Sequence, residues 1–174
     1  MPESYTGRMR QDRESQRTYS QSVTTNSMSA TANVATLLGS KGRDVFSIKP
    51  DDTLGHAVEL LRDHRIGALV VTDDSGALVG ILSERDIVRK LAETPGKTLP
   101  QQVKEVMTSK VETCTPDDPL VSVLQKMTAG RFRHLPALDD SGKLVGVVTI
   151  GDVIGFRLRE LEHETLQLKQ LIVG

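Results

Sequence analysis

The sequence contains very little cysteine and few aromatic residues. Cys114 is the single cysteine among 174 residues, so no disulfide can close within one chain, and a lone thiol suits a reducing compartment. Aromatic residues make up 3% of the chain, tryptophan is absent, and both tyrosines lie in the first 20 residues. A planar ligand would therefore have to be held by aliphatic side chains rather than between two aromatic rings.

Net charge and long apolar runs are also lacking. The 22 Lys and Arg residues against 23 Asp and Glu leave a charge of -1, which argues against electrostatic binding to nucleic acid or to an anionic membrane. No apolar run approaches the roughly 18 to 20 residues of a membrane span, and the N-terminus lacks the apolar core of a signal peptide. We therefore expect a cytoplasmic protein. Arginines near the N-terminus leave the mitochondrial matrix as an alternative.

Residues 1–30 differ in composition from the rest of the chain. They are rich in Ser, Thr, Gln and Arg and show almost no apolar periodicity, which is typical of a disordered tail. Periodic sequence begins shortly after Met28. Residues 1–27 therefore belong either to the natural protein or to an extension upstream of its natural start.

An internal repeat organises the remaining sequence. The segment Pro50-Asp51-Asp52 aligns with Pro116-Asp117-Asp118 at an offset of 66 residues. The match continues without a gap for about 45 residues, and roughly a third of the aligned positions are identical, which chance does not give at constant register. A lead-in segment at 34–38 also resembles residues 103–107. The chain is therefore two copies of one unit.

Each unit shows the same order of expected elements. A short strand, at 45–48 or 111–115, precedes an Asp-Asp pair that we expect to cap a helix beginning near Leu54 or Leu120. Two short apolar strands follow, at 68–72 and 77–82 in the first unit, joined by an Asp-Asp-Ser-Gly turn. A second helix, at 84–91 or from Gly151 onward, completes the unit. This order predicts an α+β fold with two tandem β-α-β-β-α repeats at 33–95 and 101–158.

The last segment, residues 157–173, is expected to form an amphipathic helix. Its apolar positions alternate three and four apart, which leaves a stripe for another surface to cover. We expect a homodimer partner to cover it, and the alternative is packing on its own module. The stripe consists of Leu158, Leu161, Thr165, Leu168 and Ile172.

The repeated unit resembles the cystathionine-beta-synthase (CBS) domain family. The resemblance rests on Leu-Val-Gly-Ile-Leu-Ser-Glu-Arg-Asp in one copy, and on Arg-His-Leu-Pro with Leu-Val-Gly-Val-Val-Thr-Ile-Gly-Asp in the other. It covers about 140 residues, from near Asn33 to the C-terminus. It implies a Bateman module in which two repeats are related by a pseudo-twofold axis, a homodimer, and clefts between repeats that bind adenosyl ligands.

Two hydroxyl–carboxylate pairs occupy the position where the family binds ribose. Ser83 with Asp86, and Thr149 with Asp152, each lie three apart just after a strand and at the start of a helix. A carboxylate there can accept hydrogen bonds from a ribose diol, while the hydroxyl and free N–H groups face phosphate. The same pattern also makes a capping box, which merely satisfies a helix N-terminus. We expect both pairs to contact ribose.

Basic residues supply candidate phosphate contacts. Arg131 and Arg133 offer planar guanidinium groups, and His134 can add a donor near neutral pH. Arg85, beside Asp86, is a further candidate. Because the first repeat replaces Arg133 and His134 with glycine and alanine, we expect the two clefts to differ. The expected walls of the adenine pocket are Ile66, Leu69, Phe132, Leu135 and Pro136.

Catalytic and metal signatures are missing from the sequence. The four histidines lack metal-ligand spacing, and no nucleophile–base pattern accompanies Cys114. We therefore expect no enzyme and no catalytic cofactor or metal. The favoured function is a regulatory module that binds AMP, with ATP, NAD or S-adenosylmethionine as alternative ligands, and signals occupancy to a protein partner. The alternative is a dimerisation scaffold with vestigial clefts.

Overall fold

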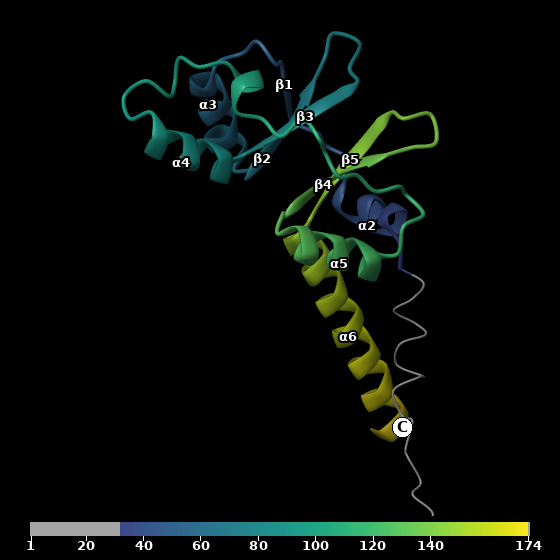
Figure 1. Ribbon diagram of the computed structural model, residues 1–174. Helices are drawn as coiled ribbons and strands as arrows, with labels where there is room; N and C mark the ends of the chain where they lie inside the picture. Colours follow the sequence, from purple (N-terminus) through teal and green to yellow (C-terminus); the bar gives the residue numbers. More distant parts are fainter. Residues whose placement is uncertain (1–31, 174) are drawn as a thin grey trace, which may run out of the picture.

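The computed structural model describes residues 32–173, in which two similar repeats each combine a small sheet with helices (Figure 1). The predicted tail lies outside these residues. Helix α2 (Val34–Lys41) precedes the first repeat, and the short 3-10 helix η1 (Val103–Glu105) precedes the second. The first repeat contains β1 (Ser47–Ile48), α3 (Leu54–His64), β2 (Ala68–Thr72), β3 (Leu78–Ser83) and α4 (Glu84–Glu93). The second contains α5 (Leu120–Gly130), β4 (His134–Leu138), β5 (Leu144–Thr149) and α6 (Ile150–Val173). The predicted α+β fold is confirmed.

The two sheets differ by one strand. In the first repeat β1 runs parallel to β2, and β2 is antiparallel to β3; in the second, β4 pairs only with β5. The strand predicted at 111–115 is therefore wrong, because in this segment Cys114 alone pairs, as an isolated bridge to Ala137. In the first repeat the N–H of Val70 donates to the carbonyl of Phe46. The aligned residue in the second repeat is Pro136, which has no N–H to donate, so the ladder cannot extend.

The helix caps also differ from the expected Asp-Asp caps. Thr53 is the N-cap of α3, and its side chain accepts a hydrogen bond from the N–H of His56. The aligned Pro119 occupies the N-cap of α5 without a side-chain bond. Asp52 and Asp118 instead accept from the N–H groups of Lys49 and Thr115 (2.9 and 3.1 Å), and so close the turn that precedes each helix.

The lead-in of each repeat packs on the other repeat. The N–H of Val34 donates to the backbone carbonyl of Asp118 in the second repeat at 3.0 Å, and the N–H of Val103 donates to the backbone carbonyl of Asp52 in the first at 2.8 Å. Val34, Leu37 and Leu38 belong to the second hydrophobic core, while Val103 belongs to the first. Helix α2 contacts β5 and α6 accordingly, and Figure 1 shows it beside β5. The first repeat, predicted to begin at residue 33, therefore includes α2 in sequence, but α2 packs with the second repeat.

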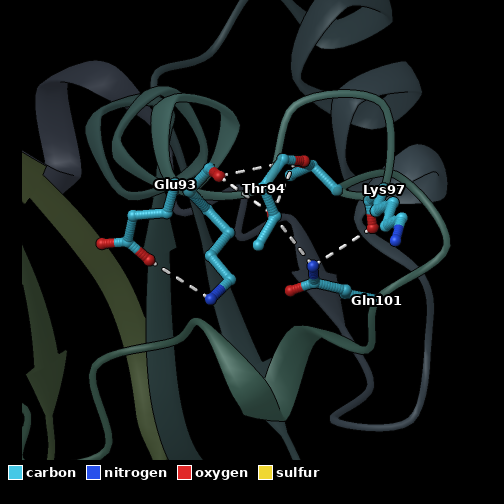
Figure 2. A network of polar contacts seen from close by, with 6 residues as sticks. Glu93, Thr94, Lys97 and Gln101 are labelled. Atoms are coloured by element: carbon cyan, nitrogen blue, oxygen red, sulfur yellow. Dashed lines mark hydrogen bonds and ion pairs between the residues drawn. The ribbon is translucent and has the colours of Figure 1, made fainter.

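The segment between α4 and η1 is fixed by a polar network (Figure 2). Thr98 is 1% exposed, and its hydroxyl donates to the carbonyl of Thr94 at 2.7 Å. The amide of Gln101 donates to the Thr94 hydroxyl and to the carbonyl of Lys97, at 3.0 and 3.1 Å. These bonds hold the connection in a defined path that returns residues 101–104 to the first repeat.

Helix α6 is continuous from Ile150 to Val173, so the helix predicted from Gly151 onward and the amphipathic helix predicted at 157–173 are one element. Val153 and Phe156, near its start, pack on the second core. Beyond them α6 extends away from both repeats (Figure 1). Among residues 32–173, no helix combines the length and apolar character needed to cross a bilayer.

Candidate functional site

A cavity of about 490 Å³ lies between the two repeats, which we call the interrepeat cavity. Its volume falls in the range of small-molecule sites. The end of α2 and the segment after it form one wall, residues 65–68 of the first repeat form another, and the second repeat closes it. The lining residues are Lys41, Gly42, Asp44, Phe46, Arg65, Ile66, Gly67, Ala68, Arg133, His134, Val147, Thr149, Ile150, Gly151 and Asp152.

Thr149 and Asp152 form a reciprocal cap at the junction of β5 and α6. The N–H of Asp152 donates to Thr149 Oγ1 at 3.1 Å, and the N–H of Thr149 donates to Asp152 Oδ2 at 2.9 Å. Within residues 32–173, the hydrogen bonds to Asp152 all end on Oδ2. The capping interpretation and the ribose interpretation are therefore compatible, because capping leaves Oδ1 as an acceptor beside the cavity.

Lys41 is a residue of this site that the sequence analysis missed. Its Nζ lies 2.5 Å from Asp152 Oδ2 and 2.7 Å from the carbonyl oxygen of Val147. Burial raises the pKa of Asp152, but the hydrogen bonds from Lys41 and Thr149 outweigh it and lower the pKa overall. Asp152 is therefore ionised at neutral pH. Because 111 residues separate the pair, only the packing of α2 on the second repeat reveals it.

Two arginines and a histidine join Lys41 around the cavity. Arg65 is the C-cap of α3 and lines the cavity; it adopts the left-handed conformation, with φ of 55°, as the aligned Arg131 does at the end of α5. Arg133 and His134, the predicted phosphate contacts, also line the cavity. Burial lowers the pKa of His134, with Arg133 and Lys41 acting in the same direction and Glu84 and Asp152 opposing them. The lining thus combines the basic residues Lys41, Arg65 and Arg133 with the carboxylates of Asp44 and Asp152, and with a histidine whose pKa is lowered.

The pair Ser83 and Asp86 lies at the pseudosymmetric position, and we use the name second cleft for the surroundings of Ser83, Arg85 and Asp86. Asp86 Oδ2 accepts hydrogen bonds from the N–H and the hydroxyl of Ser83, at 2.9 and 2.6 Å. Here Arg85 Nη1 donates to the carbonyl of Arg131 at 3.0 Å and so links the two repeats. The residue aligned with Arg85 is Gly151, which has no side chain to span the interrepeat cavity. The two clefts are therefore not equivalent, and Arg85 and Arg131 lie outside the interrepeat cavity.

Only part of the predicted adenine wall lines the cavity. Ile66 does, but Leu69 and Leu135 are fully buried in the two cores, so their assignment as pocket walls is wrong. Successive side chains of a strand point to opposite faces of the sheet. Ala68 and His134, one residue earlier on β2 and β4, therefore line the cavity instead. Phe132 packs over Gly130, where an added Cβ would lie 2.1 Å from its ring, and Pro136 is buried inside β4.

Phe46 is the aromatic residue that lines the cavity, and the sequence analysis overlooked it. Its ring stacks on His64 with a centroid distance of 4.1 Å and an interplanar angle of 30°. Phe46 lies two residues before the buried Ile48, and alternate residues of a strand share a face. This spacing was the sequence feature that could have identified Phe46. Phe46 gives the cavity one aromatic surface.

Comparison with known proteins agrees with this architecture. The chain is 37% identical over 128 residues to the CBS domain-containing protein CBSX3, mitochondrial, of Arabidopsis thaliana. This match covers 71% of the chain but 62% of CBSX3, so the chain spans less than two thirds of the length of that relative. Among solved structures, the CBS-domain containing protein ATU1752 from Agrobacterium tumefaciens superposes with a TM-score of 0.71 at 41% identity, covering 73% of this chain and 94% of the other.

Two further similar structures contain adenosine compounds. CBSX2 in complex with AMP matches with a TM-score of 0.58 and 29% identity, covering 67% of this chain and 89% of the other. The CBS domain pair of protein MJ0100, in complex with 5-methylthioadenosine and S-adenosyl-L-methionine, matches with a TM-score of 0.66 and 27% identity, covering 74% and 98%. The CBS domain model itself matches residues 41–93 and 103–159. With two matched repeats and the expected fold, the chain belongs to the CBS domain family, as a tandem pair of such domains.

Proposed function

We propose that the protein is a regulatory module that binds an adenine nucleotide in the interrepeat cavity and signals its occupancy to a protein partner. The observation that carries the proposal is the ionised Asp152, fixed by Thr149 and Lys41 in a cavity that also holds Arg65 and Arg133. AMP is the favoured ligand, with ATP, NAD or S-adenosylmethionine as alternatives. The module acts through binding rather than catalysis.

The chemistry of the lining suits the three parts of a nucleotide. Asp152 Oδ1 can accept from a ribose hydroxyl, since the protein's own hydrogen bonds occupy Oδ2. Lys41, Arg65 and Arg133 attract phosphate oxygens. Phe46, Ile66 and Val147 offer apolar surface to a base. A cavity that is mostly apolar with a few placed polar groups is the usual form of a ligand site.

The related structures support the adenosine part of this proposal. AMP, 5-methylthioadenosine and S-adenosyl-L-methionine share adenine and ribose but differ in the group at the ribose 5′ carbon. Lys41 is paired with Asp152, but Arg65 and Arg133 also line the interrepeat cavity and favour the member that carries a phosphate. This charge preference is why AMP ranks above the methylthio and sulfonium compounds for this chain.

Signalling follows from the position of the cavity. A nucleotide there contacts both repeats together with the end of α2, so binding favours the relative placement of repeats that best surrounds it. We expect a homodimer and a separate target protein, in a reducing compartment such as the cytoplasm. The competing proposal is a dimerisation scaffold with vestigial clefts.

A thermal-shift scan of the full chain tests the function. The panel contains AMP, ADP, ATP, NAD, S-adenosylmethionine and the corresponding guanine nucleotides. A ligand at 100 times its dissociation constant adds about 2.7 kcal/mol to the free energy of unfolding. The proposal predicts stabilisation by adenine nucleotides, with AMP strongest, and none by the guanine series. No shift with any adenine ligand would favour the scaffold.

A further inference from the structure

An unpartnered apolar stripe runs along α6, which we call the α6 seam. Its members follow at intervals of four, three, four, three and four residues, the a and d positions of a heptad repeat. Each is exposed in the single chain, which is unusual for a continuous row of large apolar residues. The α6 seam consists of Ile154 (47% exposed), Leu158 (56%), Leu161 (42%), Thr165, Leu168 (61%) and Ile172 (83%).

The described part of the chain leaves the α6 seam uncovered. Val153 and Phe156, which pack on the second core, lie on a neighbouring face of the helix. Figure 1 shows that α6 continues beyond α5, away from both repeats. The exposed fractions of Leu168 and Ile172 agree with this projection. The α6 seam can therefore join another helix without disturbing the packing of either repeat.

The charges beside the α6 seam are complementary to a second copy of the same helix. Arg157 and Glu164 occupy g positions, while Glu162 and Lys169 occupy e positions. In a parallel pair, each g residue faces the e residue five positions later on the partner helix. Arg157 then faces Glu162 of the partner subunit, and Glu164 faces Lys169 of the partner subunit. All these contacts join opposite charges.

An antiparallel pair would lose this complementarity. With the α6 seams fully overlapped, e residues face e residues and g residues face g residues. Glu162 would then face Glu162 of the partner subunit, and Glu164 would face Glu164 of the partner subunit. Among residues 32–172, Glu162, Glu164 and Lys169 form no ion pair, so they are available for contacts between chains. Arg157 pairs with Glu160 of its own helix at 3.1 Å, a half-buried pair that it would exchange for Glu162 of the partner subunit.

The one polar member of the α6 seam is compatible with a helix interface. Thr165 Oγ1 donates to the carbonyl of Leu161 at 2.8 Å, so its hydroxyl is satisfied within the helix and its methyl group can pack. Thr165 and Ile172 are β-branched residues at a positions, while Leu161 and Leu168 occupy d positions. Ile172 at a with Leu168 at d is the combination that favours two strands, whereas Leu158 at a and Ile154 at d, at the start of the seam, are the opposite combination. The preference for two strands therefore comes from the C-terminal part of the α6 seam and from the charge pairs beside it. We propose that α6 forms a parallel, two-stranded coiled coil with α6 of a second copy of this chain.

Measuring the oligomeric state tests whether a second copy of the chain covers the α6 seam. Sedimentation of the full chain should show a dimer, and Leu161→Glu should raise its dissociation constant by at least about tenfold, the effect of roughly 1.4 kcal/mol. The matched control is Leu166→Glu, since Leu166 is 57% exposed on the same helix but lies outside the seam. Circular dichroism confirms that both variants fold. A monomeric parent chain, or a dimer that Leu161→Glu leaves intact, would overturn the proposal.

Charge exchange and an introduced cysteine test the parallel orientation. Glu164→Lys and Lys169→Glu should each weaken the dimer, and the double exchange should restore it, because the exchanged charges face one another again. Ile172→Cys should form a disulfide between the chains under mild oxidation, and the native Cys114 does not compete because it is 2% exposed. In an antiparallel pair, residue 172 would face residue 154 of the other helix. The two copies of residue 172 would then lie about 27 Å apart along the helix axis. A dimer without this disulfide, or without restoration by the double exchange, would overturn the parallel arrangement.

Discussion

The ammonium group of Lys41 lies 2.5 Å from the carboxylate of Asp152, although one precedes the first repeat and the other lies in the second. Both side chains are about one quarter exposed, at 27% and 26%. This ion pair fastens α2 to the start of α6 beside the interrepeat cavity. It also orients Asp152, because the Lys41 and Thr149 bonds all engage Oδ2.

Replacing Lys41 should change how stability depends on pH. The pKa of Asp152 is lowered in the folded chain, so its contribution is present above the unfolded pKa and is lost as pH falls through the folded pKa. Lys41→Met removes the hydrogen bond that helps lower this pKa. We expect a loss of about 0.5 to 1 kcal/mol at pH 7 and a smaller further loss on acidification than in the parent chain.

Denaturant titrations at pH 7 and pH 3 measure both effects. The control is Lys104→Met, whose partner Asp51 lies 2.6 Å away in a more exposed pair (49% and 74% exposed side chains). The control should stay within about 0.5 kcal/mol of the parent chain. If Lys41→Met and the parent chain lose the same free energy of unfolding between pH 7 and pH 3, the ion pair does not lower the pKa of Asp152.

Filling the position of Gly151 should close the interrepeat cavity. A Cβ at Gly151 would approach only Thr149 Oγ1, at 3.8 Å, so a side chain can be added without a clash at its base. Gly151→Arg copies the aligned Arg85, which spans the second cleft. We expect the dissociation constant for AMP to rise by at least about tenfold, measured by calorimetry.

The control for this variant is Gly39→Arg. It adds the same charge to an exposed face of α2, where nothing lies within 4 Å of an added Cβ. Its affinity for AMP should match that of the parent. If Gly151→Arg binds AMP as well as Gly39→Arg does, the nucleotide occupies another place.

The packing of α2 on the second repeat predicts a strong effect at Gly146. An added Cβ there would lie 2.7 Å from Leu38 Cδ2, and Leu38 is 2% exposed. Gly146→Ala should therefore lower the free energy of unfolding by about 1 to 3 kcal/mol. Thermal and denaturant unfolding measure the change.

Gly39→Ala, on helix α2 itself, is the contrasting variant. Because this site is open, alanine should stabilise α2 by about 0.5 to 1 kcal/mol. If the two side chains compete for one space, the double variant Leu38→Ala with Gly146→Ala should lose less stability than the sum of the two single losses. Independent, additive losses would contradict the packing of α2 against β5.

The sequence predicted the repeat, the order of helices and strands, and half of the site. The offset of 66 residues made Thr149 and Asp152 visible, and the basic cluster identified Arg133 and His134. Phe46 and Lys41 were missed because the lead-in crosses to the other repeat, which local periodicity does not report. Leu69 and Leu135 were misplaced by one residue, and in a strand a shift of one residue reverses the face. Residues 111–115 do not form a strand because Pro136, which lies in the facing strand and far away in sequence, has no N–H to donate.

The central claim, that an adenine nucleotide binds beside Asp152, is tested most directly by calorimetric titration of AMP into Asp152→Ala and Asp86→Ala. The two residues occupy the same position in the two repeats, so each variant controls for the loss of a helix-start carboxylate. The account predicts that Asp152→Ala loses at least about tenfold in affinity, while Asp86→Ala binds like the parent chain. Loss with Asp86→Ala alone would place the nucleotide in the second cleft, and unchanged binding by both variants would contradict a ribose contact at either aspartate.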